Sequence, residues 1–192
     1  LIPGIVPWFF YSEALNCVTG CLQEYSYLVK KVVFQVEILP IIKLISCMLV
    51  HAFFAGIMLA VFLCYGRLPM ATWIQCIRAM LALAFGYLTS AINVFFKDMA
   101  QIVSICLQFG MWLTPIMYQE TMFADKAPWF VTILKLNPFY YVVAGYRDSM
   151  LTGNWFWERP KLGIYFWVVT LVIGLLGLRV FKRLRPHFSD VL

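Results

Sequence analysis

Charged residues are scarce in this chain. Asp, Glu, Lys and Arg make up 12% of its 192 residues, whereas soluble domains carry about 25%. This scarcity excludes an ordinary soluble domain, and an aromatic content of 18% excludes a disordered chain. Hydrophobic residues reach 63% and the mean hydropathy is +0.84. The sequence therefore predicts an all-α integral membrane protein.

The chain also lacks the motifs of several functional classes. Its six cysteines form no Cys-x-x-Cys pair and lie in apolar stretches, so we interpret them as packing residues. No Ser-His-Asp set, His-Glu-x-x-His motif or phosphate-binding loop is present, and we expect neither catalytic residues nor a bound metal. The formal charge of +6 comes from basic residues that flank apolar runs, which indicates lipid headgroups rather than nucleic acid as their partner.

Five apolar segments are candidates for membrane crossings, because about 20 apolar residues span the hydrocarbon core. They cover residues 5–28, 44–66, 71–96, 99–118 and 162–181. The short connections on one side and the tail carry the excess of basic residues, which predicts that this side is cytoplasmic. The basic residues of that side are Lys30, Lys31, Lys43, Lys97, Arg179, Lys182, Arg183 and Arg185.

The connection at residues 122–150 is long and apolar, and Asn137-Pro138 interrupts it. Its apolar runs are too short to span a membrane. Backbone at membrane depth must be covered by protein or line a wet cavity, so we interpret the region as two short re-entrant helices that form a gate. The alternative is a simple interfacial loop, rich in Trp and Tyr because their rings favour the headgroup zone.

The connection at residues 29–40 is predicted to be a helix that docks a partner. On a helical wheel over residues 28–39, Phe34 and Ile38 fall among the polar residues, which is typical of a protein–protein contact. Pro40 is expected to end this helix. In the alternative, the segment bends near Gln35 and both apolar side chains face the bundle. The apolar face holds Leu28, Val29, Val32, Val33, Val36 and Leu39, and the polar face holds Lys30, Lys31, Gln35 and Glu37.

Isolated polar residues inside the crossings have two interpretations each. Arg78 is either a pathway charge for an anionic substrate or a headgroup anchor, and His51 is either functional or a neutral, hydrogen-bonded side chain. Glu13 requires polar or aqueous surroundings, so its crossing should face other helices rather than lipid. Lys97 and Asp98 form either a turn pair or a contact with a partner.

Six motifs occur in an order that resembles the membrane subunit of type-2 ABC exporters of cell-surface polysaccharides, which move O-antigen, capsule or teichoic acid chains. They are GIVPWFF at residues 4–10, KKVVFQVEILP at 30–40, NVFFKD at 93–98, LTPIMY at 113–118, LNP at 136–138 and GYR at 145–147. The chain departs from the family at Gln35, where Pro is usual, and at Lys97, where Arg is usual and would add a planar fork of donors.

The resemblance implies a non-catalytic, multi-pass permease subunit in a bacterial inner (plasma) membrane. A homodimer would form the channel, and a separate cytoplasmic ABC ATPase would bind ATP and Mg, so no cofactor is expected on this chain. The substrate would be a lipid-linked polysaccharide. The chain would be an N-terminally incomplete fragment with five of six crossings, since the family's first crossing has no counterpart here.

The resemblance also implies roles for particular residues. The ATPase would contact the coupling segment, here residues 29–40, through Lys30, Lys31, Phe34, Gln35, Glu37 and Ile38. Sugar rings stack on aromatic faces, so a translocation path is expected along aromatic side chains, and packing is the alternative role of the same residues. These residues are Trp8, Phe9, Tyr11, Trp112 and Tyr118. The outer gate would include Pro115, Asn137, Pro138, Tyr146 and Arg147.

Two other functions compete with export by an ATPase-driven permease. An ion- or proton-coupled secondary transporter would need paired intramembrane acids and usually internal repeats, and the sequence offers neither beyond Glu13. A membrane-embedded transferase acting on lipid-linked sugars would need an acidic or His site at a membrane surface, for which His51 and Asp98 are poor material.

Overall fold

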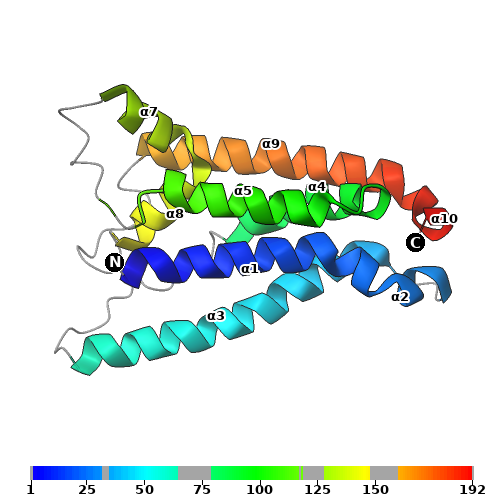
Figure 1. Cartoon of the computed structure of the whole chain (residues 1–192), viewed down its shortest axis with the longest axis horizontal. Coiled ribbons are helices and arrows are strands. Elements are labelled where there is room, and N and C mark those ends of the chain that lie inside the picture. The colour runs from blue at the N-terminus through cyan, green and yellow to red at the C-terminus, as the bar shows by residue number, and fades with distance from the viewer. Residues whose placement is uncertain are drawn as a thin grey trace. The chain divides into compact units, whose positions relative to one another are not determined.

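The computed structural model describes residues 2–31, 35–64, 79–116, 118, 128–147 and 160–191, and every regular element within these ranges is a helix (Figure 1). The predicted all-α class is confirmed for this part of the chain. The elements are α1 (Ile2–Glu24), α2 (Ser26–Lys31), η1 (Val36–Ile38), α3 (Leu39–Cys64), α4 (Ala79–Phe95), α5 (Met99–Leu113), α7 (Pro128–Leu136), α8 (Pro138–Arg147), α9 (Pro160–Leu184), η6 (Arg185–His187) and α10 (Phe188–Val191).

Proline marks the start of several helices. Pro128, Pro138 and Pro160 are the first residues of α7, α8 and α9. The first helical position suits proline, because its backbone N–H would have no partner inside the helix and the ring presets φ. The proline-rich stretch of the sequence thus specifies where these helices begin.

Within the described residues, two helices are long and apolar enough to cross a membrane, namely Val36–Cys64 and Pro160–His187. Shorter apolar helices cover Leu81–Phe95 and Met99–Leu113. The side chains of α3 are largely uncovered, with Leu49 71% and Phe53 69% exposed, as expected of a helix that contacts lipid or another protein. The count of five crossings stays a prediction.

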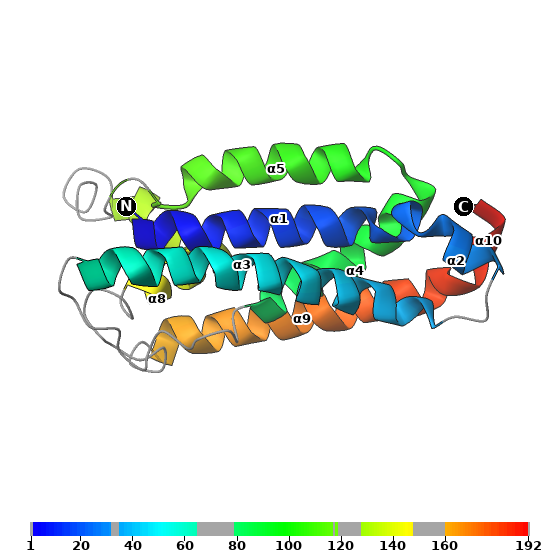
Figure 2. The same cartoon turned by 90° about the horizontal axis from the view of Figure 1, so that it is seen from below.

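The chain divides into two compact units. The hairpin unit, which contains α7 and α8, comprises residues 1–9, 51–78 and 108–169. The tail unit, which contains α2, η1 and α10, comprises residues 10–50, 79–107 and 170–192. Helices α1, α3, α5 and α9 contribute residues to both units, and Figure 2 shows them from a second direction.

The core of the tail unit joins the last turns of α9 to α4 and to the segment that precedes α3. Phe181 packs edge-on against Tyr87 and against Phe188, with 5.4 Å between ring centroids in both pairs. Pro186 lies in η6, where α9 has ended, and the chain then turns so that Phe188 is 1% exposed. The buried cluster comprises Cys21, Leu22, Val36, Leu39, Tyr87, Ala91, Val94, Phe181 and Phe188.

A buried polar network links α1 to α4 and α5 within the tail unit. The Nδ2 of Asn93 donates to the Thr19 carbonyl at 3.0 Å, and its Oδ1 accepts from the Ala100 backbone N–H at 3.2 Å, in the first turn of α5. Gln23 Nε2 donates to the Asn93 carbonyl at 2.7 Å, and the hydroxyls of Thr19 and Thr89 are 2.7 Å apart. Asn93 is 1% exposed, so water cannot replace these bonds.

Asn93→Ala should destabilise the chain by about 2 kcal/mol, because it removes the buried bond to Thr19 and leaves the Ala100 N–H at the start of α5 without its side-chain acceptor. Asn16→Ala is the matched control. Asn16 is exposed and accepts one bond from Ser104, and a polar bond between membrane helices contributes about 0.6 kcal/mol on average. Thermal unfolding of both variants in detergent measures the difference. Equal losses would show that burial of Asn93 adds nothing.

Candidate functional site

The coupling segment is bent, and the single helix predicted over residues 29–40 does not form. Helix α2 ends at Lys31, and Gln35 has an extended backbone with φ −75° and ψ 90° before the short helix η1. The physical reason is the weak helix propensity of the β-branched residues in this stretch. Pro40 lies in the first turn of α3 rather than ending a helix, since a proline there loses no hydrogen bond.

Burial separates the side chains of this segment. Val36 and Leu39 are 8% and 3% exposed, whereas Ile38 is 37% exposed and Gln35 is exposed. The bend at Gln35 agrees with the alternative interpretation, but Ile38 does not face the interior as that alternative required. Lys30 and Lys31 form the end of α2, and Phe34 and Arg78 lie outside the described residues.

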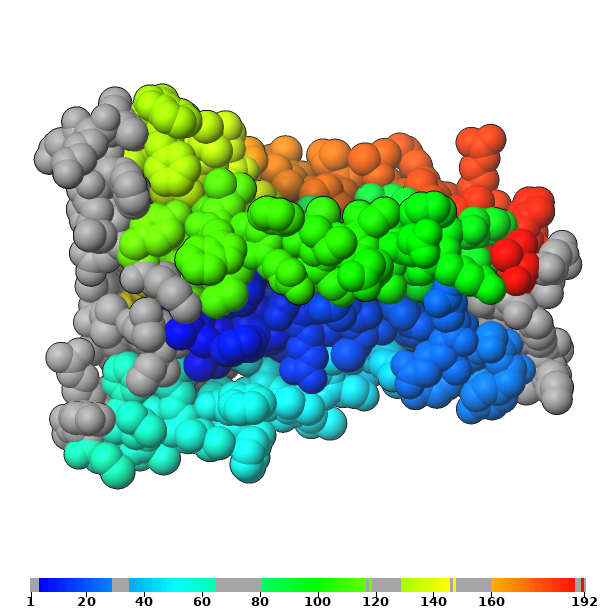
Figure 3. All heavy atoms as spheres, in the orientation of Figure 1, coloured from blue at the N-terminus to red at the C-terminus, as the bar shows by residue number. Residues whose placement is uncertain are grey.

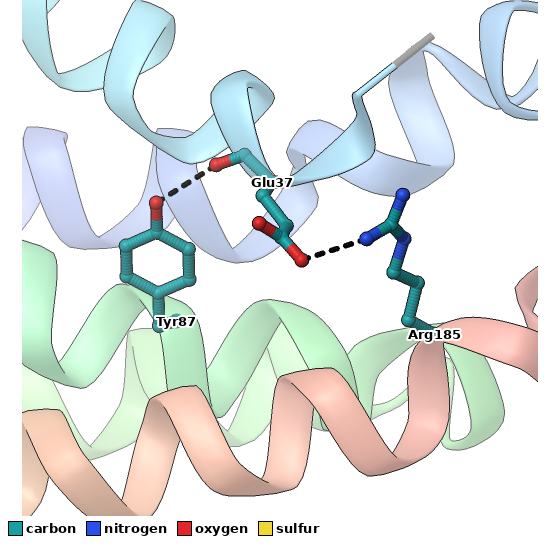
Figure 4. Close-up of polar contacts among 3 residues, drawn as sticks. All are labelled: Glu37, Tyr87 and Arg185. Carbon is teal, nitrogen blue, oxygen red and sulfur yellow. Dashed lines mark hydrogen bonds and ion pairs between the residues drawn. The ribbon is translucent and has the colours of Figure 1, made fainter. Parts of the chain in front are cut away.

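Two contacts fix Glu37 from opposite directions (Figure 4). The hydroxyl of Tyr87 in α4 donates to the Glu37 backbone carbonyl at 2.8 Å. The Nη1 of Arg185, directly after α9, lies 2.8 Å from Glu37 Oε1 and forms an ion pair with it. The coupling segment is therefore connected to α4 and to the end of α9 through a single residue.

A second ion pair lies where α1 ends and α3 begins. Lys43 Nζ is 2.8 Å from both carboxylate oxygens of Glu24, and it lies 4.9 Å from the centroid of the Tyr25 ring. The ring face attracts the ammonium group, so Lys43 is held by two partners. Glu24 and Lys43 lie before and after the coupling segment in the sequence, so this ion pair ties its two flanks together.

In the hairpin unit, Asn137 determines the break between α7 and α8. Its Oδ1 accepts from the Phe139 backbone N–H at 3.0 Å, which makes Asn137 the N-cap of α8, and its Nδ2 donates to Thr114 Oγ1 at 3.1 Å. The two helices have 9 and 10 residues. At about 1.5 Å per residue neither can span the hydrocarbon core.

Arg147 holds the irregular chain that follows α5. Its guanidinium donates to the Ile116 carbonyl and, at 3.4 Å, to the Tyr118 carbonyl. Gly4 permits this approach, because a Cβ at that position would lie 3.3 Å from Arg147 Nη2 and from the Ile116 oxygen. Pro115 is buried in the same segment, whereas the side chain of Tyr146 lies outside the described part. Arg147 thus supplies donors to backbone carbonyls that no helix satisfies.

The predicted path aromatics divide into buried and exposed residues. Trp8 is 4% exposed and meets Phe139 edge-on at 5.5 Å, and Tyr11 is 2% exposed, so both occupy packing positions. Phe9 and Trp112 are 60% and 75% exposed. The half-buried Tyr118 donates its hydroxyl to the Trp112 carbonyl at 3.2 Å.

Three exposed polar side chains and the half-buried Ser104 follow α1 and α5 within the tail unit. Glu13 and Asn16 share one face of α1, and Gln101 and Ser104 share one face of α5, since each pair is three residues apart. Ser104 Oγ donates to Asn16 Oδ1 at 3.0 Å, which brings the two faces together. We call these four residues the polar stripe. Polar groups at membrane depth require water or a protein partner. Figure 3 shows the side chains of α5 uncovered on the face in view.

No family model matches the chain, but it is similar to several known proteins. Two proteins from Klebsiella pneumoniae are both named O-antigen export system permease protein RfbA. They are 25% and 24% identical to this chain over an alignment of 199 positions, which covers all of this chain and 74% of each relative. A protein of the same name from Myxococcus xanthus is 26% identical over 194 residues, covering 97% of this chain and 73% of the relative.

This chain resembles O-antigen export permeases along its whole length. The resemblance predicted from the six motifs is therefore confirmed. Three of the six motifs contain residues with a structural role: Asn93 joins helices, Asn137 caps α8, and Arg147 binds backbone carbonyls.

Sequence reasoning missed the contacts of Tyr87 and Arg185 and the polar stripe. The sequence places Arg185 only in a basic tail, and 148 positions separate it from Glu37, so no local pattern pairs them. Asn16, Gln101 and Ser104 gave a weak signal: a spacing of three residues between polar side chains in apolar helices. His51 is half-buried in α3, and Lys97 and Asp98 are exposed in the turn between α4 and α5.

Proposed function

We propose that this chain is the transmembrane subunit of an ATP-driven exporter that moves a lipid-linked polysaccharide across a bacterial inner (plasma) membrane. The observation that carries the proposal is the similarity, along the whole chain, to three proteins named as O-antigen export permeases. The chain is a transporter component rather than an enzyme, and ATP and Mg bind to a separate ATPase subunit.

The ATPase docks on the coupling segment. Ile38 supports this proposal because it is an exposed aliphatic side chain beside charged Glu37 and exposed Gln35, on a segment that is anchored by buried Val36 and Leu39. An apolar contact with a polar rim is the usual anatomy of a protein interface. The sequence also predicts Phe34, Lys30 and Lys31 as ATPase contacts.

The polysaccharide passes along a path between two copies of the chain. The polar stripe supports this, because its amide, hydroxyl and carboxylate groups can exchange hydrogen bonds with sugar hydroxyls that replace water. In the hairpin unit, exposed Phe9 and Trp112 offer ring faces on which sugars stack. The uncovered apolar side chains of α5 face the second copy and lipid.

The outer gate consists of α7 and α8 as re-entrant helices. Support comes from their lengths, which are too short to span, and from the bonds of Asn137 and Arg147, which satisfy irregular backbone near Thr114 and Ile116. Tyr165 adds a link, since its hydroxyl donates to the Leu136 carbonyl at 2.5 Å. Pro115 and Pro138 fix the turns that enter this region.

Co-expression of the chain with an ABC ATPase from the same organism should yield a complex that exports the lipid-linked polysaccharide from loaded proteoliposomes only when ATP is supplied. A labelled lectin outside the vesicles measures the exported glycan, and an ATPase variant lacking its catalytic carboxylate is the control. Transport driven by an ion gradient without the ATPase would indicate a secondary transporter. Formation of a new glycosidic bond would indicate a transferase.

A further inference from the structure

One of the contacts that connect the segment carrying Ile38 to the rest of the tail unit is an exposed ion pair. The Glu37–Arg185 ion pair is accessible to water on both sides, with side-chain exposures of 39% and 45%. Exposed ion pairs contribute little to stability, because water screens them and the side chains lose freedom. The pair is better suited to set the position of Glu37 than to stabilise the chain.

Tyr87 acts on the same residue from a buried position. It is 7% exposed, its ring packs against Phe181 of α9, and its hydroxyl reaches the Glu37 carbonyl at 2.8 Å. A rigid aromatic ring with a single polar tip fixes both the distance and the direction of the carbonyl it binds. Figure 4 shows Glu37 between Tyr87 and Arg185, with its carbonyl and carboxylate directed to different partners.

The C-terminal segment places Arg185 at this point. Pro186 follows Arg185 directly, and Phe188 is buried between Phe181 and Phe95, with ring centroids 5.4 Å and 6.1 Å away. Helix α10 contacts both α2 and α4. The backbone of Arg185 is thereby held on both sides, by α9 before it and by the buried Phe188 after it.

We propose that Arg185 and Tyr87 are positioning residues that hold the coupling segment so that movement of the ATPase reaches α4 and α9. This inference rests on the proposed function. Ile38 lies next to Glu37, so a displacement of Ile38 by a docked partner pulls on the carbonyl and carboxylate that Tyr87 and Arg185 bind. The two contacts convert a movement of the short helix η1 into a movement of two long helices.

The test uses charge exchange in the complex of full chain and ATPase. Arg185→Glu should leave ATP hydrolysis near the wild-type rate and lower the polysaccharide exported per ATP about two- to fivefold, the range that an exposed ion pair supports. Glu37→Arg should lower the same ratio, which is counted per ATP hydrolysed so that a change in docking is separated from a change in coupling. The double variant should restore the ratio. Tyr87→Phe should lower it about fivefold, as expected from the loss of one hydrogen bond of ordinary strength.

Arg183→Glu is the matched control. Arg183 is exposed, and its replacement by Glu makes the same charge change two positions before Arg185. An equal loss in Arg183→Glu, no restoration in the double variant, or a Tyr87→Phe variant with wild-type coupling would each overturn the inference. Failure of the wild-type chain to bind an ATPase or to export would instead overturn the proposed function.

Discussion

Ile38→Glu is expected to abolish ATP-driven export while leaving the chain folded. Ile38 is 37% exposed in the tail unit, so a carboxylate at this position remains hydrated in the isolated chain. In the docked complex the same carboxylate would lose its water at the centre of an apolar contact. Substitutions at such contacts cost about 2–4 kcal/mol, which corresponds to a roughly 30- to 1000-fold weaker association with the ATPase. Binding of the purified ATPase to the permease in nanodiscs measures this change.

Val191→Glu provides the control for this prediction. Val191 is also an exposed aliphatic residue of the tail unit, with 43% exposure, and it lies outside the coupling segment. We expect Val191→Glu to bind the ATPase like the wild type, and both variants to unfold at the wild-type temperature. Phe34→Ala, the second position predicted from the sequence, should add to the loss. Undiminished binding by Ile38→Glu would place the docking contact elsewhere on the chain.

The sequence could predict those features that depend on local patterns. Apolar runs without charge predicted helices where α3, α5 and α9 form, because burial of a long apolar segment and satisfaction of its backbone both require a helix in lipid. Asn137-Pro138 predicted the break between α7 and α8, because Asn caps a helix and Pro suits its first position. The helical wheel also placed Ile38 on the polar side, and Ile38 is exposed, although the continuous helix that the wheel assumed does not form.

Features that depend on distant residues could not be predicted in this way. The wheel assumed one helix through Gln35, and the observed bend reflects a balance between weak local propensity and tertiary anchors on Val36 and Leu39. Trp8 and Tyr11 are of a residue type that suits a sugar path, but packing within the chain buries them. Aromatic side chains serve both purposes, so only their surroundings distinguish the roles.

Gly86→Val is expected to destabilise the chain by about 3 kcal/mol or more, because it overfills the contact between α1 and α4 in the tail unit. A Cβ on Gly86 would lie 2.4 Å from Val18 Cγ1 and 3.0 Å from Val18 Cβ, both far inside van der Waals contact. Val18 cannot easily turn away, since β-branched side chains in a helix keep one preferred rotamer. A thermal scan in detergent should show unfolding at a temperature lower by roughly 10 °C.

Gly20→Val separates this steric effect from the general cost of valine in a helix. A Cβ on Gly20 would have no atom within 4 Å, and the residue lies in α1 of the same unit. Valine is a better helix former than glycine, so Gly20→Val should be neutral or slightly stabilising. Shortening the opposing side chain tests the contact directly: Val18→Ala should restore part of the stability lost in Gly86→Val.

If Gly86→Val instead unfolds at the same temperature as Gly20→Val, then α1 and α4 do not approach as closely as the structure has them. The hydroxyl pair of Thr19 and Thr89, which lies on the same two helices, would then need a separate explanation.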